Sequence, residues 1–85
     1  MRQATEVYAR TFDSVLFGLP QAIRTQIESK ISELGGRLEN FPHHRLQGRS
    51  EFRLRVGDFR VIYEFDLEMN ELYLIALGNR REVYR

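Results

Sequence analysis

The chain has 85 residues, of which 42% are hydrophobic and 29% are charged. These proportions are typical of a globular protein and exclude a disordered chain, and the length predicts one domain over residues 1–85. Because the chain has no cysteine, disulfides and thiolate metal ligands are excluded, as fits a reducing compartment. No segment approaches the roughly 20 apolar residues that span a bilayer, so we expect a cytoplasmic protein without a membrane partner.

The type of basic residue in this chain is more informative than its net charge. The net charge is +1, yet twelve of the thirteen basic residues are arginine. The planar guanidinium group of arginine suits bidentate contacts with phosphate. A general arginine bias in composition explains the count equally well, so the positions of the arginines decide between the two.

The N-terminal half predicts a strand and two helices. Residues 5–9, TEVYA, are β-prone, and apolar residues recur on one helical face between residues 11 and 19, at Phe12, Val15, Leu16 and Leu19. Pro20 is suited to the first turn of a second helix. That helix carries apolar residues at positions 23, 27, 31 and 34, and Gly35 and Gly36 predict its end.

Residues 37–49 predict an irregular loop, since they contain Pro42 and Gly48. His43 and His44 lie in this loop. Adjacent side chains of an extended segment point apart, and no third ligand is close in the sequence, so we expect no metal site.

The segment FRLRVGDFRVIYEF, residues 52–65, predicts a β-hairpin with Gly57 and Asp58 as its two-residue turn. In this register Arg55 faces Arg60, Arg53 faces Ile62, and the apolar residues share the other face, which packs on the long helix. Like charges directly opposed in a sheet are destabilising. The face is therefore either a binding surface for an anion or a solvated surface on which acids such as Glu64 relax the repulsion.

A last strand is predicted over residues 71–77, after a turn at residues 66–70. It is almost uniformly apolar, as is typical of a strand in the interior of a sheet. The sequence GNRREVYR follows it. If this tail folds back across the arginine face, Arg80, Arg81 and Tyr84 join the hairpin arginines in a cleft suited to a phosphate chain.

Four segments together resemble the RelE branch of the RelE/ParE superfamily of type II toxins: LP at residues 19–20, RLQG at 45–48, the hairpin at 52–65 and ALGNRREVY at 76–84. The resemblance spans the whole chain and is most specific in its C-terminal half. It implies an α+β fold in which an N-terminal strand and two helices pack on an antiparallel sheet of about four strands.

The resemblance also implies a toxin that enters the ribosomal A site and cleaves mRNA there. In that family the RNA 2′-hydroxyl attacks the adjacent phosphate without a metal ion or other cofactor. Basic residues stabilise the dianionic phosphorane, which preorganised cations do well. By position, the implied catalytic residues are Arg55, Arg60, Arg80 and Tyr84. Tyr84 either takes the 2′-hydroxyl proton or stacks on a base. The implied RNA-binding residues are Arg45, Arg49, Arg53 and Arg81.

The sequence departs from the family pattern in two places. Arg53 and Arg55 stand where relatives have lysine, and Asn79 stands where many have histidine. Arginine does not give up its proton in proteins. These changes keep the stabilising charge and remove two kinds of proton carrier.

The resemblance implies a cognate antitoxin, the ribosome with its mRNA, and operator DNA bound only through the antitoxin. Two other functions stay open. One is a ParE-like inhibitor of DNA gyrase, which shares the fold, and the other is a non-catalytic member that only binds its antitoxin.

Overall fold

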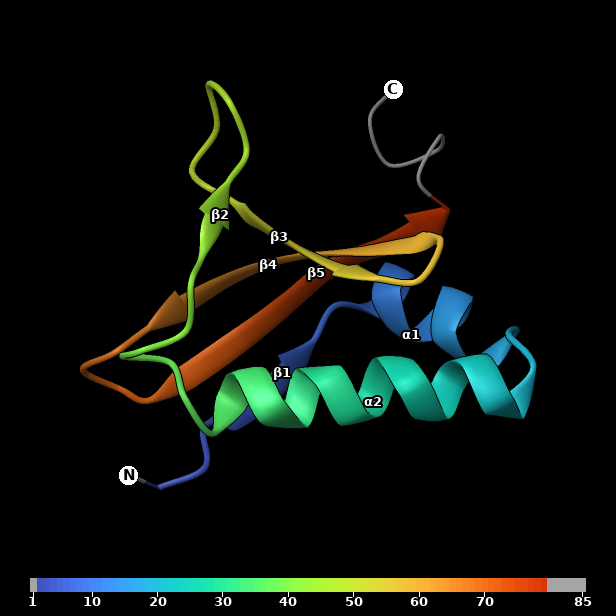
Figure 1. The fold of residues 1–85 in the computed structure, drawn as a ribbon, viewed down its shortest axis with the longest axis horizontal. Coiled ribbons are helices and arrows are strands. Elements are labelled where there is room, and N and C mark those ends of the chain that lie inside the picture. The colour runs from blue at the N-terminus through green and yellow to red at the C-terminus, as the bar shows by residue number, and fades with distance from the viewer. Residues whose placement is uncertain (1, 80–85) are drawn as a thin grey trace.

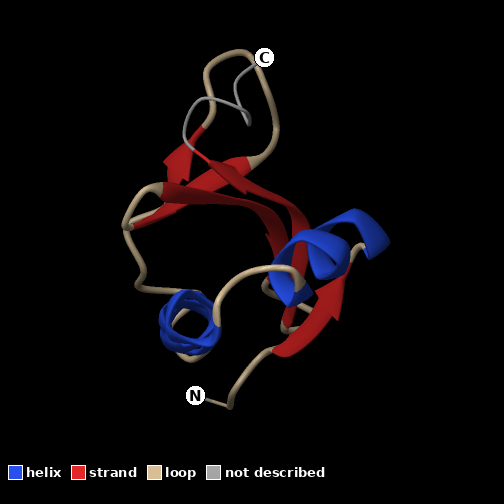
Figure 2. Ribbon diagram, turned by 90° about the vertical axis from the view of Figure 1, so that its right-hand side faces the viewer, coloured by secondary structure: helices blue, strands red, loops and turns tan. Residues whose placement is uncertain are grey.

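The computed structural model describes residues 2–79 of the chain. Seven elements follow one another: β1 (Thr5–Tyr8), α1 (Arg10–Phe17), α2 (Gln21–Gly35), β2 (His44–Arg45), β3 (Phe52–Val56), β4 (Phe59–Asp66) and β5 (Glu71–Asn79). Figure 1 shows the strands as one twisted sheet, and both helices lie on the same face of it in Figure 2. The fold is α+β, as the sequence predicts. Neither helix of the described segment is long and apolar enough to cross a bilayer.

The sheet has five strands in the order β1-β5-β4-β3-β2. Strands β2 to β5 pair in antiparallel fashion, but β1 pairs in parallel with β5. The expected antiparallel sheet of about four strands is therefore wrong in two details. The strand β2 has only two residues, which are too few to show an alternating pattern in the sequence. The direction of β1 relative to β5 depends on the path that the chain takes through the two helices, which the sequence does not show.

The predicted hairpin is confirmed pair by pair. Phe52 is opposite Tyr63, Leu54 is opposite Val61, and Val56 is opposite Phe59. Gly57 has φ of +60°, which is the conformation that the first turn residue requires and that glycine adopts without strain.

The face of the sheet that the helices cover is the inner face, and it holds the core. Val61, Tyr63, Leu72 and Leu74 of the sheet are fully buried there. They pack with Phe12 and Leu16 of α1 and with Ile27, Ile31 and Leu34 of α2. We call the opposite face of the sheet the outer face.

The strand β5 lies between β1 and β4, which confirms the prediction of an interior strand. Its uniform apolar character has a second cause. Tyr63 pairs with Leu74 while Ile62 pairs with Ala76, so that Ile75 is the extra residue of a β-bulge. The bulge shifts the alternation by one position and hides it in the sequence.

The helices differ slightly from prediction. The first runs over residues 10–17 instead of 11–19, and Val15, expected on its apolar face, is 38% exposed. Pro20 precedes α2 as its N-cap, one position before the first turn. The helix α2 ends at Gly35 as predicted, where a Cβ atom would lie 2.7 Å from the Gln3 side chain. A residue with a Cβ atom at this position would displace the end of the Gln3 side chain.

Candidate functional site

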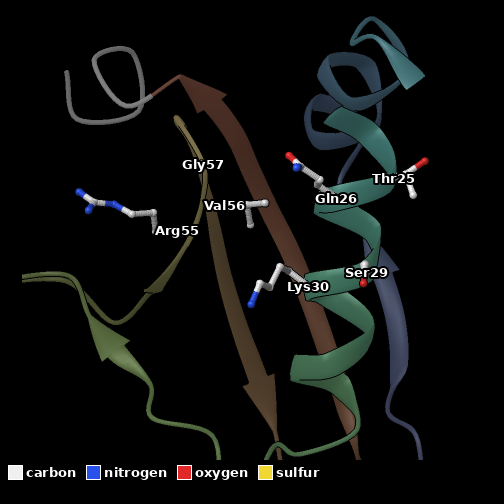
Figure 3. Close-up of a pocket in the computed structure, with 7 residues that line it drawn as sticks. All are labelled: Thr25, Gln26, Ser29, Lys30, Arg55, Val56 and Gly57. Carbon is white, nitrogen blue, oxygen red and sulfur yellow. The ribbon is translucent and has the colours of Figure 1, made fainter. Parts of the chain in front are cut away.

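The outer face of the β3–β4 hairpin carries the arginines that the sequence places there. Arg53 and Arg55 of β3 are exposed, and Arg60 of β4 is 6% exposed. Figure 3 shows the alternation directly, since Val56 points toward α2 while the adjacent Arg55 points away from it. The pleat of the strand is thus what separates the charged residues from the core.

Arg55 and Arg60 are directly opposed across the hairpin. Arg55 forms no ion pair with any residue that the structure describes. Glu64 cannot neutralise this pair, because it lies four residues along β4 from Arg60, about 13 Å at the rise of a strand. Its carboxylate instead accepts a hydrogen bond from Ser50 at 3.1 Å. The proposed relief of the repulsion by Glu64 therefore does not operate at the turn end of the hairpin.

The neighbouring strand presents small residues beside this pair. Gly78 of β5 is opposite Arg60, and Ala76 is opposite Ile62. Both residues have small side chains or none. These two residues of β5 therefore add little side-chain volume beside the arginine pair.

The outer face has opposite charge at its other end. Asp66 is opposite Glu71, and Glu64 is opposite Tyr73. The Tyr73 hydroxyl donates a hydrogen bond to the Glu71 carboxylate, and this bond raises the pKa of Tyr73 to about 12. The face is thus basic at the β3–β4 turn and acidic at the β4–β5 turn.

The loop between β2 and β3 forms a second basic region. A depression of about 440 Å³ is lined by Arg45, Leu46, Gln47, Arg49 and Arg53, so three of the expected RNA-binding arginines are brought together. Figure 1 shows this loop projecting from the sheet on the side away from the helices. The Arg49 Nε atom forms an ion pair with Glu51 at 3.0 Å. The Arg45 guanidinium lies 4.8 Å from the centre of the Phe52 ring, in a cation–π contact.

A second depression, of about 460 Å³, lies between α2 and the hairpin turn. It is lined by Thr25, Gln26, Ser29, Lys30, Arg55, Val56 and Gly57. Figure 3 shows the Arg55 side chain directed away from it. This depression is therefore separate from the arginine pair.

The two adjacent histidines have different surroundings. His43 lies on the inner side in an aromatic cluster with Phe41, Phe52, Tyr63 and Phe65. Its ring stacks on that of Phe65, with the ring centroids 4.2 Å apart. The Nε2 atom of His43 donates to the Leu38 carbonyl at 2.8 Å, and its Nδ1 atom accepts from the Tyr63 hydroxyl at 2.6 Å. His44 is exposed on β2 opposite Arg53. Sequence reasoning could not place His44 on the arginine face, because the two-residue strand β2 is too short to be predicted.

The residues of the expected site that follow β5 are Arg80, Arg81 and Tyr84, and they lie outside the described residues. Their convergence with the hairpin arginines therefore stays a prediction. Asn79 is the last residue of β5 and is opposite Phe59. Residues 2–79 contain no cluster of three or more histidine, aspartate or glutamate side chains that could hold a metal ion.

Comparison with known proteins gives a family over nearly the whole chain. Residues 2–84 match the family model described as the ParE toxin of the type II toxin–antitoxin system, parDE. No match to the chain is found among the curated proteins.

Several solved structures have a similar fold. The toxin–antitoxin complex RelBE2 of Mycobacterium tuberculosis matches with a TM-score of 0.77 and 20% identity, over 96% of this chain and 97% of that one. The RelE–RelB complex of Pyrococcus horikoshii matches with a TM-score of 0.77 and 22% identity, over 95% and 99%. The isolated Escherichia coli RelE toxin matches with a TM-score of 0.76 and 19% identity, over 95% and 90%. The chain therefore belongs to the RelE/ParE superfamily of type II toxin–antitoxin toxins, in the family described as ParE toxin.

Proposed function

We propose that this toxin is a ribosome-dependent endoribonuclease that cleaves mRNA in the ribosomal A site. The observation that carries the proposal is the opposed pair of Arg55 and Arg60 on the outer face. Two like charges held opposite each other cost stability, and a bound phosphodiester is a ligand that both can contact. Arginine forks match phosphate oxygens in geometry as well as charge.

The proposed chemistry is attack of the RNA 2′-hydroxyl on the adjacent phosphate. The bond from O2′ to phosphorus forms while the bond to O5′ breaks, and the transition state carries two negative charges on its equatorial oxygens. Arg55, Arg60 and, in the tail, Arg80 would stabilise these charges, which is the largest single contribution in many enzymes. The arginines supply the charge that a metal ion would otherwise supply, so the proposal needs no metal or other cofactor.

The RNA strand on either side of the scissile phosphate needs its own contacts. We propose that Arg45, Arg49 and Arg53 bind backbone phosphates at the depression beside β2, with Arg81 contributing from the tail. Tyr84 would stack on a base or contact the reacting ribose. The ribosome would hold the message in line, which supplies the orientation that an 85-residue chain cannot supply alone. This activity requires a cytoplasmic location.

The test is a translation reaction on a defined message, with the 5′ ends of the fragments mapped. The wild-type protein is expected to produce cuts within the A-site codon. Arg55→Gln is expected to slow cleavage about 10²–10³-fold, the usual effect of removing one donor to a developing oxyanion. Intact message at protein equimolar with ribosomes would contradict the proposal.

The family match supports a second candidate, inhibition of DNA gyrase by a ParE-like mechanism, because the matched model is described as ParE toxin. The two functions are separated by a supercoiling assay with purified gyrase. Inhibition of supercoiling together with intact message would favour the gyrase function.

We also propose a cognate antitoxin as partner. The similar M. tuberculosis and P. horikoshii toxins were each solved in complex with an antitoxin. Binding of operator DNA would then occur through that antitoxin. If Arg55→Gln with Arg60→Gln binds the antitoxin but no longer arrests growth, binding alone is insufficient for toxicity, and the non-catalytic alternative is excluded.

A further inference from the structure

The arginine face needs a group that can exchange a proton, and arginine cannot provide it. Cleavage by a 2′-hydroxyl requires removal of its proton as the bond to phosphorus forms. Guanidinium groups keep their protons in proteins. Arg53, Arg55 and Arg60 therefore supply charge to the proposed site but no base.

The other titratable side chains of the outer face are unsuited to this task. Tyr73 is hydrogen-bonded to Glu71, and its pKa is raised to about 12. Glu64 accepts a hydrogen bond from Ser50, and Asp66 with Glu71 lies at the acidic end of the face. Within residues 2–79, a base for a phosphate held at Arg55 therefore has to come from the other side of the hairpin.

The strand β2 provides such a group. His44 is opposite Arg53, so its side chain shares the outer face with Arg53 and Arg55. Arg55 is two residues along β3 from Arg53, which makes it a diagonal neighbour of His44 at about 7–8 Å, within reach of long and aromatic side chains. Both β2 residues are exposed, and His44 forms no hydrogen bond or ion pair with any residue from 2 to 79. Its ring is therefore available to a ligand.

The charged groups around His44 are known from the register. Arg53 is directly opposite, and the two diagonal neighbours are Arg55 of β3 and Glu51, the residue that precedes β3. Glu51 forms an ion pair with Arg49. The next strand, β4, presents Ile62 opposite Arg53, with Glu64 beyond it. The imidazole thus lies at the edge of a mainly cationic surface that attracts a phosphate chain to it.

The other histidine cannot take this role. The chain has two histidines, and both ring nitrogens of His43 are used by Leu38 and Tyr63 within the aromatic cluster. A histidine ordinarily titrates between about pH 5 and 8, which suits a general base at neutral pH.

We infer that His44 is the general base of the proposed ribonuclease site, an inference that rests on the proposed function. His44 takes the proton of the 2′-hydroxyl, O2′ bonds to phosphorus, and the bond from phosphorus to O5′ breaks. The departing O5′ takes a proton from water, and the imidazolium then returns its proton to solvent. Arg55 and Arg60 stabilise the charge on the phosphoryl oxygens during this exchange.

The test measures single-turnover cleavage of A-site mRNA on programmed ribosomes by the full chain at several pH values. His44→Gln keeps a polar side chain of similar size and removes the titration. It is expected to reduce the rate at neutral pH about 10²-fold or more and to abolish the rise in rate with pH that the wild type shows as an imidazole loses its proton. Glu39→Gln, an exposed change in the same connection between α2 and β2, is the matched control and is expected to leave rate and pH profile unchanged.

Chemical rescue separates proton transfer from binding. Added imidazole is expected to restore part of the activity of His44→Ala and none of that of Arg60→Gln. An unchanged rate and pH profile in His44→Gln would overturn the inference and leave the nuclease proposal standing. A reduced rate with the wild-type pH profile and no rescue would also overturn it, since His44 would then act in RNA binding. Absence of cleavage by the wild type would remove both proposals.

Discussion

The two faces of the β3–β4 hairpin are formed by the same two strands but differ in the kind of side chain that they carry. On the inner face every residue between Leu54 and Tyr63 that points to the helices is apolar, and Val61 and Tyr63 are fully buried. On the outer face Arg55 is opposed to Arg60. The inner face is arranged to be buried, whereas the outer face holds like charges together at a cost to stability.

This difference teaches where to expect each kind of mutational effect. A change on the inner face alters the free energy of unfolding, and activity falls because folded protein is lost. A change at an exposed residue of the outer face, such as Arg55, is expected to leave the folded state almost unchanged and to act on activity alone. The same urea titration therefore tests both faces on one scale.

The largest effect on stability is expected from Ile31→Ala in α2. Ile31 is fully buried against the inner face, and truncation of such a residue costs about 2–5 kcal/mol through lost burial and a residual cavity. The midpoint of urea unfolding should fall accordingly. Ser32→Ala, an exposed change on the same helix, is the control. A loss below about 1 kcal/mol for Ile31→Ala would show that the helix is loosely packed on the sheet.

A smaller loss is expected from Tyr63→Phe, which removes the hydroxyl that donates to His43 at 2.6 Å. Both groups are within the aromatic cluster, so His43 Nδ1 would lose its donor, at about 1–3 kcal/mol. Unfolding at pH 7 measures this change. An unchanged midpoint would mean that solvent replaces the lost partner.

Tyr63 is also expected to make the stability of the protein depend on pH. Burial raises the pKa of Tyr63 above its ordinary value of about 10. A group whose pKa is higher in the folded state favours folding below the unfolded pKa, and this contribution is lost as the pH rises above about 10. The wild type should therefore lose stability in alkali, and Tyr63→Phe should lose less. Equal alkaline slopes would assign the effect to other tyrosines, such as Tyr8, whose pKa is also raised by burial.

Gly57→Ala is expected to cost about 1–2 kcal/mol, the price of a left-handed conformation for a residue with a Cβ atom. The structure isolates this backbone effect, because nothing lies within 4 Å of the added methyl group and φ is +60°. Chemical denaturation measures this loss as a lower free energy of unfolding. Gly18→Ala, where φ is −86°, provides a control without that conformational cost. A neutral Gly57→Ala would mean that the turn relaxes to another type.

The smallest effect on stability is expected from Arg55→Gln. Removal of one of two opposed charges should leave the unfolding free energy within about 0.5 kcal/mol of the wild type, with a gain more expected than a loss. The cleavage assay should show a large defect in the same protein. A clear loss of stability would assign Arg55 a structural role and weaken the contrast between the faces.

The sequence predicts the hairpin in full because two independent signals agree there. Alternation fixes which residues face the core, and the pair Gly57 and Asp58 fixes the register. The end of α2 is predicted for a similar reason, since its apolar period stops where Gly35 and Gly36 begin. Sequence reasoning thus places an element well where its apolar pattern and an adjacent turn or cap residue indicate the same boundary.

The remaining features depend on contacts between distant parts of the chain. The strand β2 exists only because β3 offers an edge to pair with, and the bulge at Ile75 conceals the alternation of β5. The site divides in the same way. The arginines of the hairpin were predicted on one face, whereas His44 could not be placed without β2. The roles of Arg80, Arg81 and Tyr84 stay predictions, because these residues lie beyond the described part of the chain.

The parallel pairing of β1 with β5 has a consequence for how the protein is made. Thr5 hydrogen-bonds through its backbone to the residue before β5, and Tyr8 pairs with Leu74. The hairpin of β3 and β4 is local and can form as soon as it is synthesised, but β1 must wait for the last strand of the sheet. Closure over so long a loop is entropically slow. The first strand therefore has no partner until β5 emerges, and its pairing with β5 joins the two strands of the sheet that lie farthest apart in the sequence.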